Sequence, residues 1–483
     1  MGKIPLPDID IAGVLPALIL CVAGIVVMLT GLFVRVRSIA TAAVISFVGV
    51  VLAFAANEPL RSVNRLSYSG LVAVDAFTWF LNLLLLAAAG ITILVSVRYM
   101  VDDGPELFEY FVLLLFATAG MMFMVSANHL LLIFVGLETL SISIYVLAGI
   151  MPESIRSKEA GLKYLVLGAF SSGFFLYGAA LLYGATGSLS LPTIAKFLQS
   201  DPSNLLALAG MGLLLVGFSF KVAAVPFHMW TPDVYEGAAT PLTGYMSVAV
   251  KAGAFAAFMR VFFEGLLPLQ VNWTQMLWLI AAVTMIVGNV VALVQENIKR
   301  MLAYSSIAHA GYIIIGLVAG SEAGTGGILY YLLAYTFTNL GAFAVVTLVG
   351  RKGEANTMID DYRGLAKSHP VLALAMSVFL FSLAGMPPTA GFVGKFTIFK
   401  AAVTCGYIWL VVIGVLTSAI SVYYYFRVIM KMYMETRETE IRSLQFEPSL
   451  ILALTVTAIV VLYIGIFPSP YLSLATASVK PLF

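Results

Sequence analysis

The sequence predicts an all-α polytopic membrane protein with about fourteen transmembrane helices. Three observations support this class: a very apolar composition, apolar runs of membrane-spanning length throughout the chain, and a one-sided distribution of Lys and Arg between the runs. Of the 483 residues, 61% are apolar and 10% are charged. A water-soluble domain has about a quarter charged residues, so we expect lipid to surround most of this chain.

Apolar runs follow one another with short loops between them, which leaves no room for a soluble domain. A helix needs about 20 apolar residues to cross a bilayer. The first run has no small-residue cleavage site after it, so we expect a retained span and no signal peptide. The expected spans are 11–33, 38–56, 73–97, 107–126, 129–150, 160–183, 204–230, 238–263, 274–294, 300–319, 325–349, 370–403, 407–430 and 449–468.

Basic residues of the expected loops gather on one side of the membrane. Loops after odd-numbered spans hold fifteen of them, and the other side, termini included, holds five. Because basic residues mark cytoplasmic loops, we expect both termini on the non-cytoplasmic side. The fifteen are Arg35, Arg37, Arg98, Arg156, Lys158, Lys163, Lys299, Arg300, Arg351, Lys352, Arg363, Lys367, Lys431, Arg437 and Arg442, and the five are Lys3, Arg61, Arg65, Lys196 and Lys480.

Six further basic residues fall within expected spans. Three lie near span ends, where long side chains can reach the interface: Arg260, Arg427 and Lys400. Three lie deeper, where a charge costs roughly 2.5–3.5 kcal/mol on insertion scales and usually marks an ion path: Lys221, Lys251 and Lys395. For Lys251, which small residues flank, the alternative is a side chain that reaches an interface.

Glu138 lies close to the middle of the fifth expected span, with no basic residue near it in that span. Another helix must therefore neutralise it or pair with it. The alternative to a functional role is a structural ion pair.

A lysine lies beside a proline break in two expected spans. Pro226 follows Lys221, and Pro387 and Pro388 precede Lys395. Proline removes a helix hydrogen bond, and broken backbone at membrane depth is tolerated only where it is buried in protein or lines a cavity. Transporters place ion sites at such breaks, in corresponding helices of inverted repeats.

We therefore expect two inverted five-helix repeats, spans four to eight and spans nine to thirteen, with the seventh and twelfth helices broken. The expected segments are an N-terminal three-helix segment at 1–106, the repeats at 107–263 and 274–432, and a C-terminal helix at 433–483.

Two histidines and one further lysine are candidate proton relays. His228 follows the first break, and His309 lies among hydroxyl residues within a span. An imidazole titrates near neutrality; the alternative is a hydrogen-bonded interior histidine. Lys163, near the start of the sixth span, either reaches the interface or feeds the same path.

We expect no metal or cofactor on this chain. Its four histidines are scattered without metal-ligand spacing. Cys21 and Cys405, its two cysteines, are isolated and cannot hold an iron–sulfur cluster.

Two stretches carry a family resemblance. They are Phe-Lys-Val-Ala-Ala-Val-Pro-Phe-His-Met-Trp-Thr-Pro-Asp-Val-Tyr-Glu-Gly at 220–237 and Leu-Ala-Gly-Met-Pro-Pro-Thr-Ala-Gly-Phe-Val-Gly-Lys-Phe at 383–396. Both resemble the antiporter-like subunits of complex I, the proton-pumping NADH:quinone oxidoreductase, and are most similar to its subunit N, also called subunit 2. Subunit M has a glutamate where this chain has Lys395, and subunit L continues with a lateral helix. The resemblance covers nearly the whole chain.

The resemblance implies a fourteen-helix fold with inverted repeats, and proton-transfer roles for Glu138, Lys221, Lys251 and Lys395. It implies a bacterial inner (plasma) membrane location and, as partners, the antiporter-like subunits M and L, the small subunits A, J, K and H, and the hydrophilic arm. NADH, FMN, iron–sulfur clusters and quinone are expected on those partners. No basic run suggests nucleic acid.

The hypothesis for the mechanism is gated proton transfer. A movement of Glu138 relative to Lys221 changes the proton affinity of the lysine, which then releases its proton toward Lys251. From there the proton reaches Lys395 through His309 and water. Two alternatives stay open: a subunit of a multi-subunit cation/proton antiporter of the same fold, and a scaffold subunit that conducts nothing.

Overall fold

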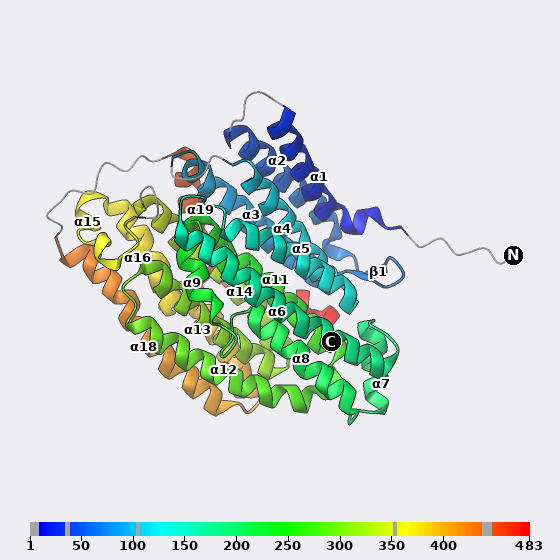
Figure 1. Ribbon diagram of the computed structural model, residues 1–483. Coiled ribbons are helices and arrows are strands. Elements are labelled where there is room, and N and C mark those ends of the chain that lie inside the picture. The colour runs from blue at the N-terminus through cyan, green and yellow to red at the C-terminus, as the bar shows by residue number, and fades with distance from the viewer. Residues whose placement is uncertain (1–8, 34–38, 103–106, 351–354, 437–446) are drawn as a thin grey trace.

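The computed structural model describes residues 9–33, 39–102, 107–350, 355–436 and 447–483. Nearly all of them are helical, and the long helices run side by side in one bundle (Figure 1). Helices satisfy their backbone N–H and C=O groups internally, as a lipid environment requires. The predicted class, an all-α polytopic membrane protein, is confirmed.

Twelve helical segments of the described ranges are long and apolar enough to cross a membrane. Two interrupted helices bring the bundle to the predicted fourteen crossings, in the predicted order: α8 (Leu205–Lys221) followed by α9 (Trp230–Gly237), and α16 (Pro370–Ala384) followed by α17 (Ala390–Thr404). The uninterrupted helices are α1 (Ile11–Phe33), α2 (Ile39–Asn57), α3 (Ala76–Asp102), α4 (Glu109–Ser126), α5 (Leu130–Ala148), α6 (Ile155–Thr186), α12 (Gln270–Leu293), α13 (Ile298–Ala319), α14 (Glu322–Val349), α18 (Ile408–Met434) and α19 (Pro448–Ile466).

Both predicted breaks are present in the seventh and twelfth helices. Directly after α8, Ala223 adopts a φ of 62°, a left-handed conformation that costs an ordinary residue about 1–2 kcal/mol. At the end of α16, Gly385 adopts a φ of 82°, which glycine accepts without this cost. Each break leaves helix ends inside the bundle, close to a lysine.

The eighth crossing contains two π-helical turns that the sequence did not indicate. It consists of α10 (Thr240–Tyr245), η2 (Met246–Val250), α11 (Lys251–Arg260) and η3 (Val261–Gly265), and both η2 and η3 are π-helical. Such turns occur frequently at functional sites. Protein surrounds this crossing on every side, so the alternative in which Lys251 reaches an interface is wrong.

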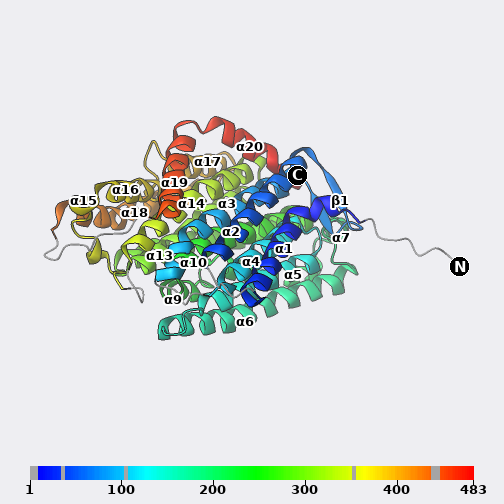
Figure 2. The same ribbon diagram turned by 90° about the horizontal axis from the view of Figure 1, so that it is seen from above.

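Short elements complete the loops. They are η1 (Glu58–Ser62), the antiparallel strands β1 (Arg65–Ser67) and β2 (Val72–Val74), α7 (Leu191–Ser200), η4 (Leu267–Leu269), η5 (Ile359–Tyr362), α15 (Leu365–Ser368), α20 (Ser469–Val479) and η6 (Lys480–Leu482). Both views place β1 and α7 at one end of the bundle and α15 at the other (Figure 2).

The end with α15 is called the basic face below. Its basic residues within the described chain are those of the loops after odd-numbered spans: Arg98, Arg156, Lys158, Lys163, Lys299, Arg300, Arg363, Lys367 and Lys431. Seven of the other loop residues used in the orientation argument lie outside the described residues: Lys3, Arg35, Arg37, Arg351, Lys352, Arg437 and Arg442.

Arg260 does not reach the interface, so that prediction is wrong. Its side chain is 1% exposed and pairs with Asp75 at 3.0 Å and with Glu264 at 2.6 Å. It also donates hydrogen bonds to the Thr78 hydroxyl and to the Val125 carbonyl oxygen, both at 3.1 Å. A buried guanidinium needs such a complete set of acceptors. Asp75 is 185 residues away in the chain, which is why the sequence did not reveal the pair.

The other two basic residues near span ends, Arg427 and Lys400, differ in how far they are buried. The half-buried Arg427 donates a hydrogen bond to the Leu293 carbonyl oxygen at 3.0 Å and another to Gln295, closing the turn between α12 and α13. Lys400 is exposed, which agrees with a side chain that extends to the interface.

Replacing Arg260 by Met should lower the stability of the protein by roughly 3–5 kcal/mol, because Asp75 and Glu264 then stay buried without a counter-charge. Thermal unfolding in detergent measures the change as a lower midpoint. Arg61→Met is the control, because Arg61 is exposed. Equal midpoints for the two variants would contradict the assignment.

Asp10 fastens the start of α1 to the small sheet. Its carboxylate accepts hydrogen bonds from the Ser67 hydroxyl at 2.6 Å, from Arg65 at 2.8 and 2.9 Å, and from the Gly13 N–H at 3.2 Å. The Ser67 hydroxyl in the first place, and then Arg65 and Gly13, hold the pKa of Asp10 below its usual range against the opposing effect of burial.

This contact should depend on pH. A carboxyl whose pKa is lowered by folding contributes its stability above the unfolded pKa, about 3.9, and loses it as the pH falls through the lower folded pKa. Hydrogen-exchange protection of the β1 and β2 amides should therefore decrease in that acid range. In Asp10→Asn the protection should be low at every pH; an unchanged acid transition in this variant would assign it to another group.

Candidate functional site

Lys221, Lys251 and Lys395 are all buried inside the bundle, with exposed fractions of 2%, 2% and 5%. Each ammonium group meets neutral oxygen atoms from other segments, and within the described chain none of the three forms an ion pair with a carboxylate. An ammonium group in a low-dielectric interior requires such acceptors.

Lys221 is the last residue of α8, at the first break. Its Nζ donates a hydrogen bond to the Ser141 hydroxyl of α5 at 2.7 Å. The rings of Tyr145 and Tyr164 lie 5.3 and 5.5 Å from the same nitrogen, within the range at which an aromatic face attracts a cation.

Glu138 lies on α5 one helical turn before Ser141, the partner of Lys221. Its half-buried carboxylate accepts a hydrogen bond from the Ser172 hydroxyl of α6. Another helix thus supplies the expected partner, but the partner is a hydroxyl group and not a base. Glu138 is close enough to Lys221 for the two charges to interact, although they are not in contact.

Lys251 begins α11, directly after the first π turn. Its Nζ donates a hydrogen bond to the Ser306 carbonyl oxygen of α13 at 2.6 Å. The π turn and the approach of α13 together fix this side chain inside the bundle.

His309 lies one turn after Ser306 on α13, between hydroxyl groups of two other helices. Its Nδ1 is hydrogen-bonded to the Tyr331 hydroxyl of α14, and its Nε2 lies 3.1 Å from the Tyr425 hydroxyl of α18. The Tyr425 hydroxyl is also 2.5 Å from the Ser305 hydroxyl. Both ring nitrogens therefore have partners that can either donate or accept a proton.

Lys395 lies on α17, just after the second break. Its Nζ donates hydrogen bonds to the Leu383 and Ala384 carbonyl oxygens at 3.0 and 3.2 Å and to the Ser418 hydroxyl at 2.9 Å. The two carbonyl groups end α16, where a helix has no partners of its own for them. The ring of Tyr312 lies 4.8 Å from Nζ.

One face of α13 therefore connects two of the lysines. Ser306 binds Lys251, His309 follows three residues later, and Tyr312, three residues after that, faces Lys395. Residues three apart lie on the same face of a helix. The structure thus places His309 between the two lysines along this face of α13.

Hydroxyl groups also lie between Lys221 and Lys251. Tyr235 of α9 lies close to Tyr164, which faces Lys221. Tyr235 and Tyr335 both approach the Ser306 hydroxyl, but none of the three oxygens completes a hydrogen bond within the described chain. Buried polar atoms nearly always bond to protein or ordered water, so this region is suited to water.

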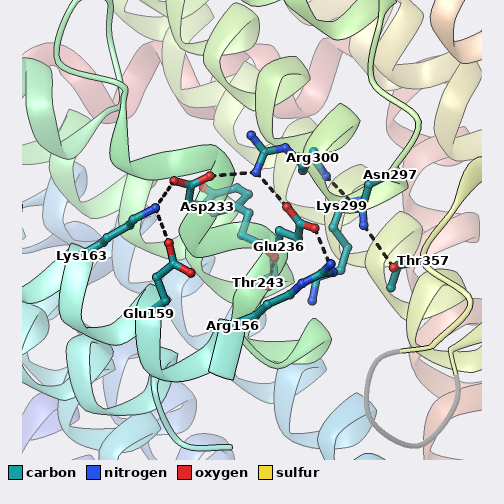
Figure 3. Close-up of polar contacts among 11 residues, drawn as sticks. Arg156, Glu159, Lys163, Asp233, Glu236, Thr243, Asn297, Lys299, Arg300 and Thr357 are labelled. Atoms are coloured by element: carbon teal, nitrogen blue, oxygen red, sulfur yellow. Dashed lines mark hydrogen bonds and ion pairs between the residues drawn. The ribbon is translucent and has the colours of Figure 1, made fainter. Parts of the chain in front are cut away.

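The other two candidate relays lie apart from this line. His228 is half-buried in the first break, and its Nδ1 is buried without a hydrogen-bond partner among the described residues. Lys163 lies at the basic face, where it pairs with Glu159 at 2.6 Å and Asp233 at 2.7 Å (Figure 3). The geometry favours the interfacial alternative for Lys163.

The sequence-based prediction missed the groups that hold the lysines. Ser141 carries a usable signal, because it follows Glu138 by three residues on the same helix. Tyr145, seven residues after Glu138 on the same helix, carries the same signal. Ser418, Tyr164 and Tyr312 come from distant segments and give no such signal.

Gly385→Ala should crowd Lys395. A Cβ there would lie 3.0 Å from the Cδ of Lys395, and the φ of 82° also strains any side chain. Gly187 is a matched control because its φ is 69° and nothing lies within 4 Å of an added Cβ. Both alanine variants should lose about 1–2 kcal/mol from backbone strain, and Gly385→Ala should lose more. Equal thermal midpoints would show that Lys395 is not confined there.

Comparisons with known proteins agree with this architecture. Residues 127–421 match the family described as NADH:quinone oxidoreductase/Mrp antiporter, TM. NADH-quinone oxidoreductase subunit N of Trichlorobacter lovleyi is 50% identical over 98% of this chain and 97% of its own length. Subunit N 2 of Roseiflexus castenholzii is 43% identical over 98% of this chain and 97% of its own.

Solved structures give the same result. A chain of respiratory complex I from Thermus thermophilus superposes with a TM-score of 0.82 at 36% identity, covering 95% of this chain and 99% of that one. A chain of the Mrp complex from Dietzia, at 19% identity and a TM-score of 0.83 over 97% of each chain, shares the fold. The chain belongs to the NADH-quinone oxidoreductase subunit N family, the antiporter-like membrane subunits of complex I.

Proposed function

We propose that this chain translocates protons across the membrane and that Lys221, Lys251 and Lys395 carry them. The observation that supports this most directly is the neutral surroundings of all three buried ammonium groups. A carboxylate partner would hold a lysine in its charged form. A hydroxyl or carbonyl oxygen binds both the charged and the neutral amine, so each lysine can gain and lose a proton in place.

The route runs from Lys221 through the hydroxyl-lined region at Tyr235 and Tyr335 to Lys251. From Lys251 it follows the face of α13, past His309 and its tyrosine partners, to Lys395. Lys395 then exchanges its proton with the far side. His228 is a candidate relay at the first break. Lys163 lies apart from the route, in ion pairs at the basic face.

Glu138 acts as the electrostatic switch of Lys221. The Glu138 carboxylate is bound to Ser172 of α6, and the Lys221 ammonium is bound to Ser141, one turn after Glu138 on α5. A small displacement of α5 or α6 changes the distance between the two charges, and with it the proton affinity of the lysine.

The energy for pumping comes from partner subunits. Moving one charge against the membrane potential requires about 2.3 kcal/mol per 100 mV, which proton-carrying side chains do not generate. Electron transfer from NADH to quinone on the hydrophilic arm and its neighbours provides it, with FMN and iron–sulfur clusters on those subunits. The neighbours in the membrane are the antiporter-like subunits M and L and the small subunits A, J, K and H.

The proposed layout follows the two breaks. Residues 107–263 and 274–432 form inverted repeats, preceded by the three-helix segment 1–106 and followed by 433–483. The excess of Lys and Arg on the basic face supports a cytoplasmic position for it. In a bacterial inner membrane both termini then lie on the non-cytoplasmic side.

Lys221→Ala tests the function directly. A group that takes part in proton transfer contributes about 10²–10⁴-fold to its rate, so transfer through this chain should stop on the timescale of turnover. Protons pumped per electron should fall in vesicles that contain the reconstituted complex. Lys400→Ala, at an exposed lysine, should not change pumping.

Unchanged pumping in Lys221→Ala would rule out its role. A variant with Glu138→Gln and alanine at all three lysines separates the scaffold alternative, since a scaffold subunit would retain full pumping. Sodium-driven transport without NADH would instead favour the cation/proton antiporter.

A further inference from the structure

An ionic network at the basic face holds α9, the second half of the broken seventh helix. Asp233 lies between Lys163 of α6 at 2.7 Å and Arg300 of α13 at 2.8 Å. Glu236 lies between the same Arg300 at 2.8 Å and Arg156 of α6 at 3.2 Å. Figure 3 shows both carboxylates reaching in two directions. These five residues are called the α9 clamp below.

The clamp matters because α9 cannot hold its own position. It has only eight residues, and isolated helices that short are unstable. The break separates it from α8, so it is placed by contacts with other segments. Each clamp pair is partly exposed, and such a pair alone contributes at most about 1 kcal/mol. Arg300 binds both carboxylates, which makes the pairs a connected network.

The first residue of α9, Trp230, packs against two neighbours of Lys221. The Trp230 indole N–H donates a hydrogen bond at 3.0 Å to the carbonyl oxygen of Phe220, the residue before Lys221. Its ring stacks on Tyr164 with centroids 4.3 Å apart and an interplanar angle of 7°. Tyr164 in turn faces the Lys221 ammonium group at 5.5 Å. The position of α9 therefore determines how Lys221 is enclosed.

The clamp also joins the two ends of the route between Lys221 and Lys251. Arg300 lies in the first turn of α13, the helix whose Ser306 binds Lys251. Through Asp233 and Glu236 it connects this helix to α9, which carries Trp230. Four of the clamp residues line an open cavity of about 260 Å³, whereas Lys221 is only 2% exposed.

We propose that Asp233 and Arg300 are positioning residues for proton transfer: they keep Trp230 packed against the neighbours of Lys221 and fix α9 relative to α13. This inference rests on the proposed function of Lys221. When the clamp is released, α9 moves, water reaches Lys221, and its proton is lost to the wrong side.

The test uses the assembled complex in vesicles with Asp233→Asn. Protons pumped per electron should fall, and amide hydrogen exchange in the segment 222–229 should rise about tenfold, which corresponds to ~1.4 kcal/mol. Asp233→Glu, which keeps the charge, should restore pumping. Asp360→Asn is the matched control: Asp360 also binds two basic residues of the basic face, Lys431 at 2.7 Å and Arg363 at 3.0 Å, but it lies on no broken helix.

Two combinations separate positioning from general destabilisation. Asp233→Asn should have no further effect on pumping in a Lys221→Ala background, and its effect should not add to that of Trp230→Phe. If Asp233→Asn prevents assembly, Arg300→Lys replaces it as the test variant. A lysine there keeps the positive charge but cannot contact Asp233 and Glu236 at the same time.

The outcomes distinguish the two proposals. Unchanged pumping in Lys221→Ala would overturn the proposed function. A pumping defect in Lys221→Ala together with normal pumping in Asp233→Asn, or in Arg300→Lys where that variant replaces it, would overturn the clamp alone. Equal effects of Asp233→Asn and Asp360→Asn would also overturn it, since the defect would then follow from any lost ion pair of this face.

Discussion

The structure depends on one constraint: an ammonium group inside a lipid-embedded bundle must be met by oxygen atoms. Regular helices keep their carbonyl groups occupied, so they offer few free acceptors. The bundle solves this in three ways. A break exposes the last carbonyls of α16 to Lys395, a π turn positions Lys251 at a carbonyl of α13, and a serine hydroxyl meets Lys221 at the end of α8. The irregular backbone is therefore where the charges are.

This constraint explains which features the sequence revealed. Prolines and buried lysines are visible in any single stretch, so the two broken helices and the three lysines could be predicted. The number and order of the spans followed from apolar length alone. The π turns on either side of α11 have no residue signature; they lie where α3, α4 and α14 pack against this crossing.

Contacts between residues that lie far apart in the sequence could not be predicted. Arg260 looked like a span-end residue because its position along the helix is visible and its partner Asp75 is not. Lys163 was ambiguous for the same reason, since Asp233 reaches it from the far side of the break. The tyrosines around His309 come from α14 and α18, and only the folded bundle shows that they bond to both of its ring nitrogens.

The buried cations divide into two kinds by their partners. Arg260 is bound to two carboxylates and has a pKa far above any physiological pH in water, so it stays charged and joins α3 to η3. The three lysines are bound to neutral oxygens, and a neutral amine still has N–H groups to donate to them. Lys221 and Lys251 each donate one such hydrogen bond, which a neutral amine can keep. Lys395 donates three, and its neutral amine has only two N–H groups, so the Ser418 hydroxyl would then donate to the amine nitrogen. A carboxylate in contact would remove this property, which gives a physical reason for Glu138 to lie one helical turn from the serine that binds Lys221.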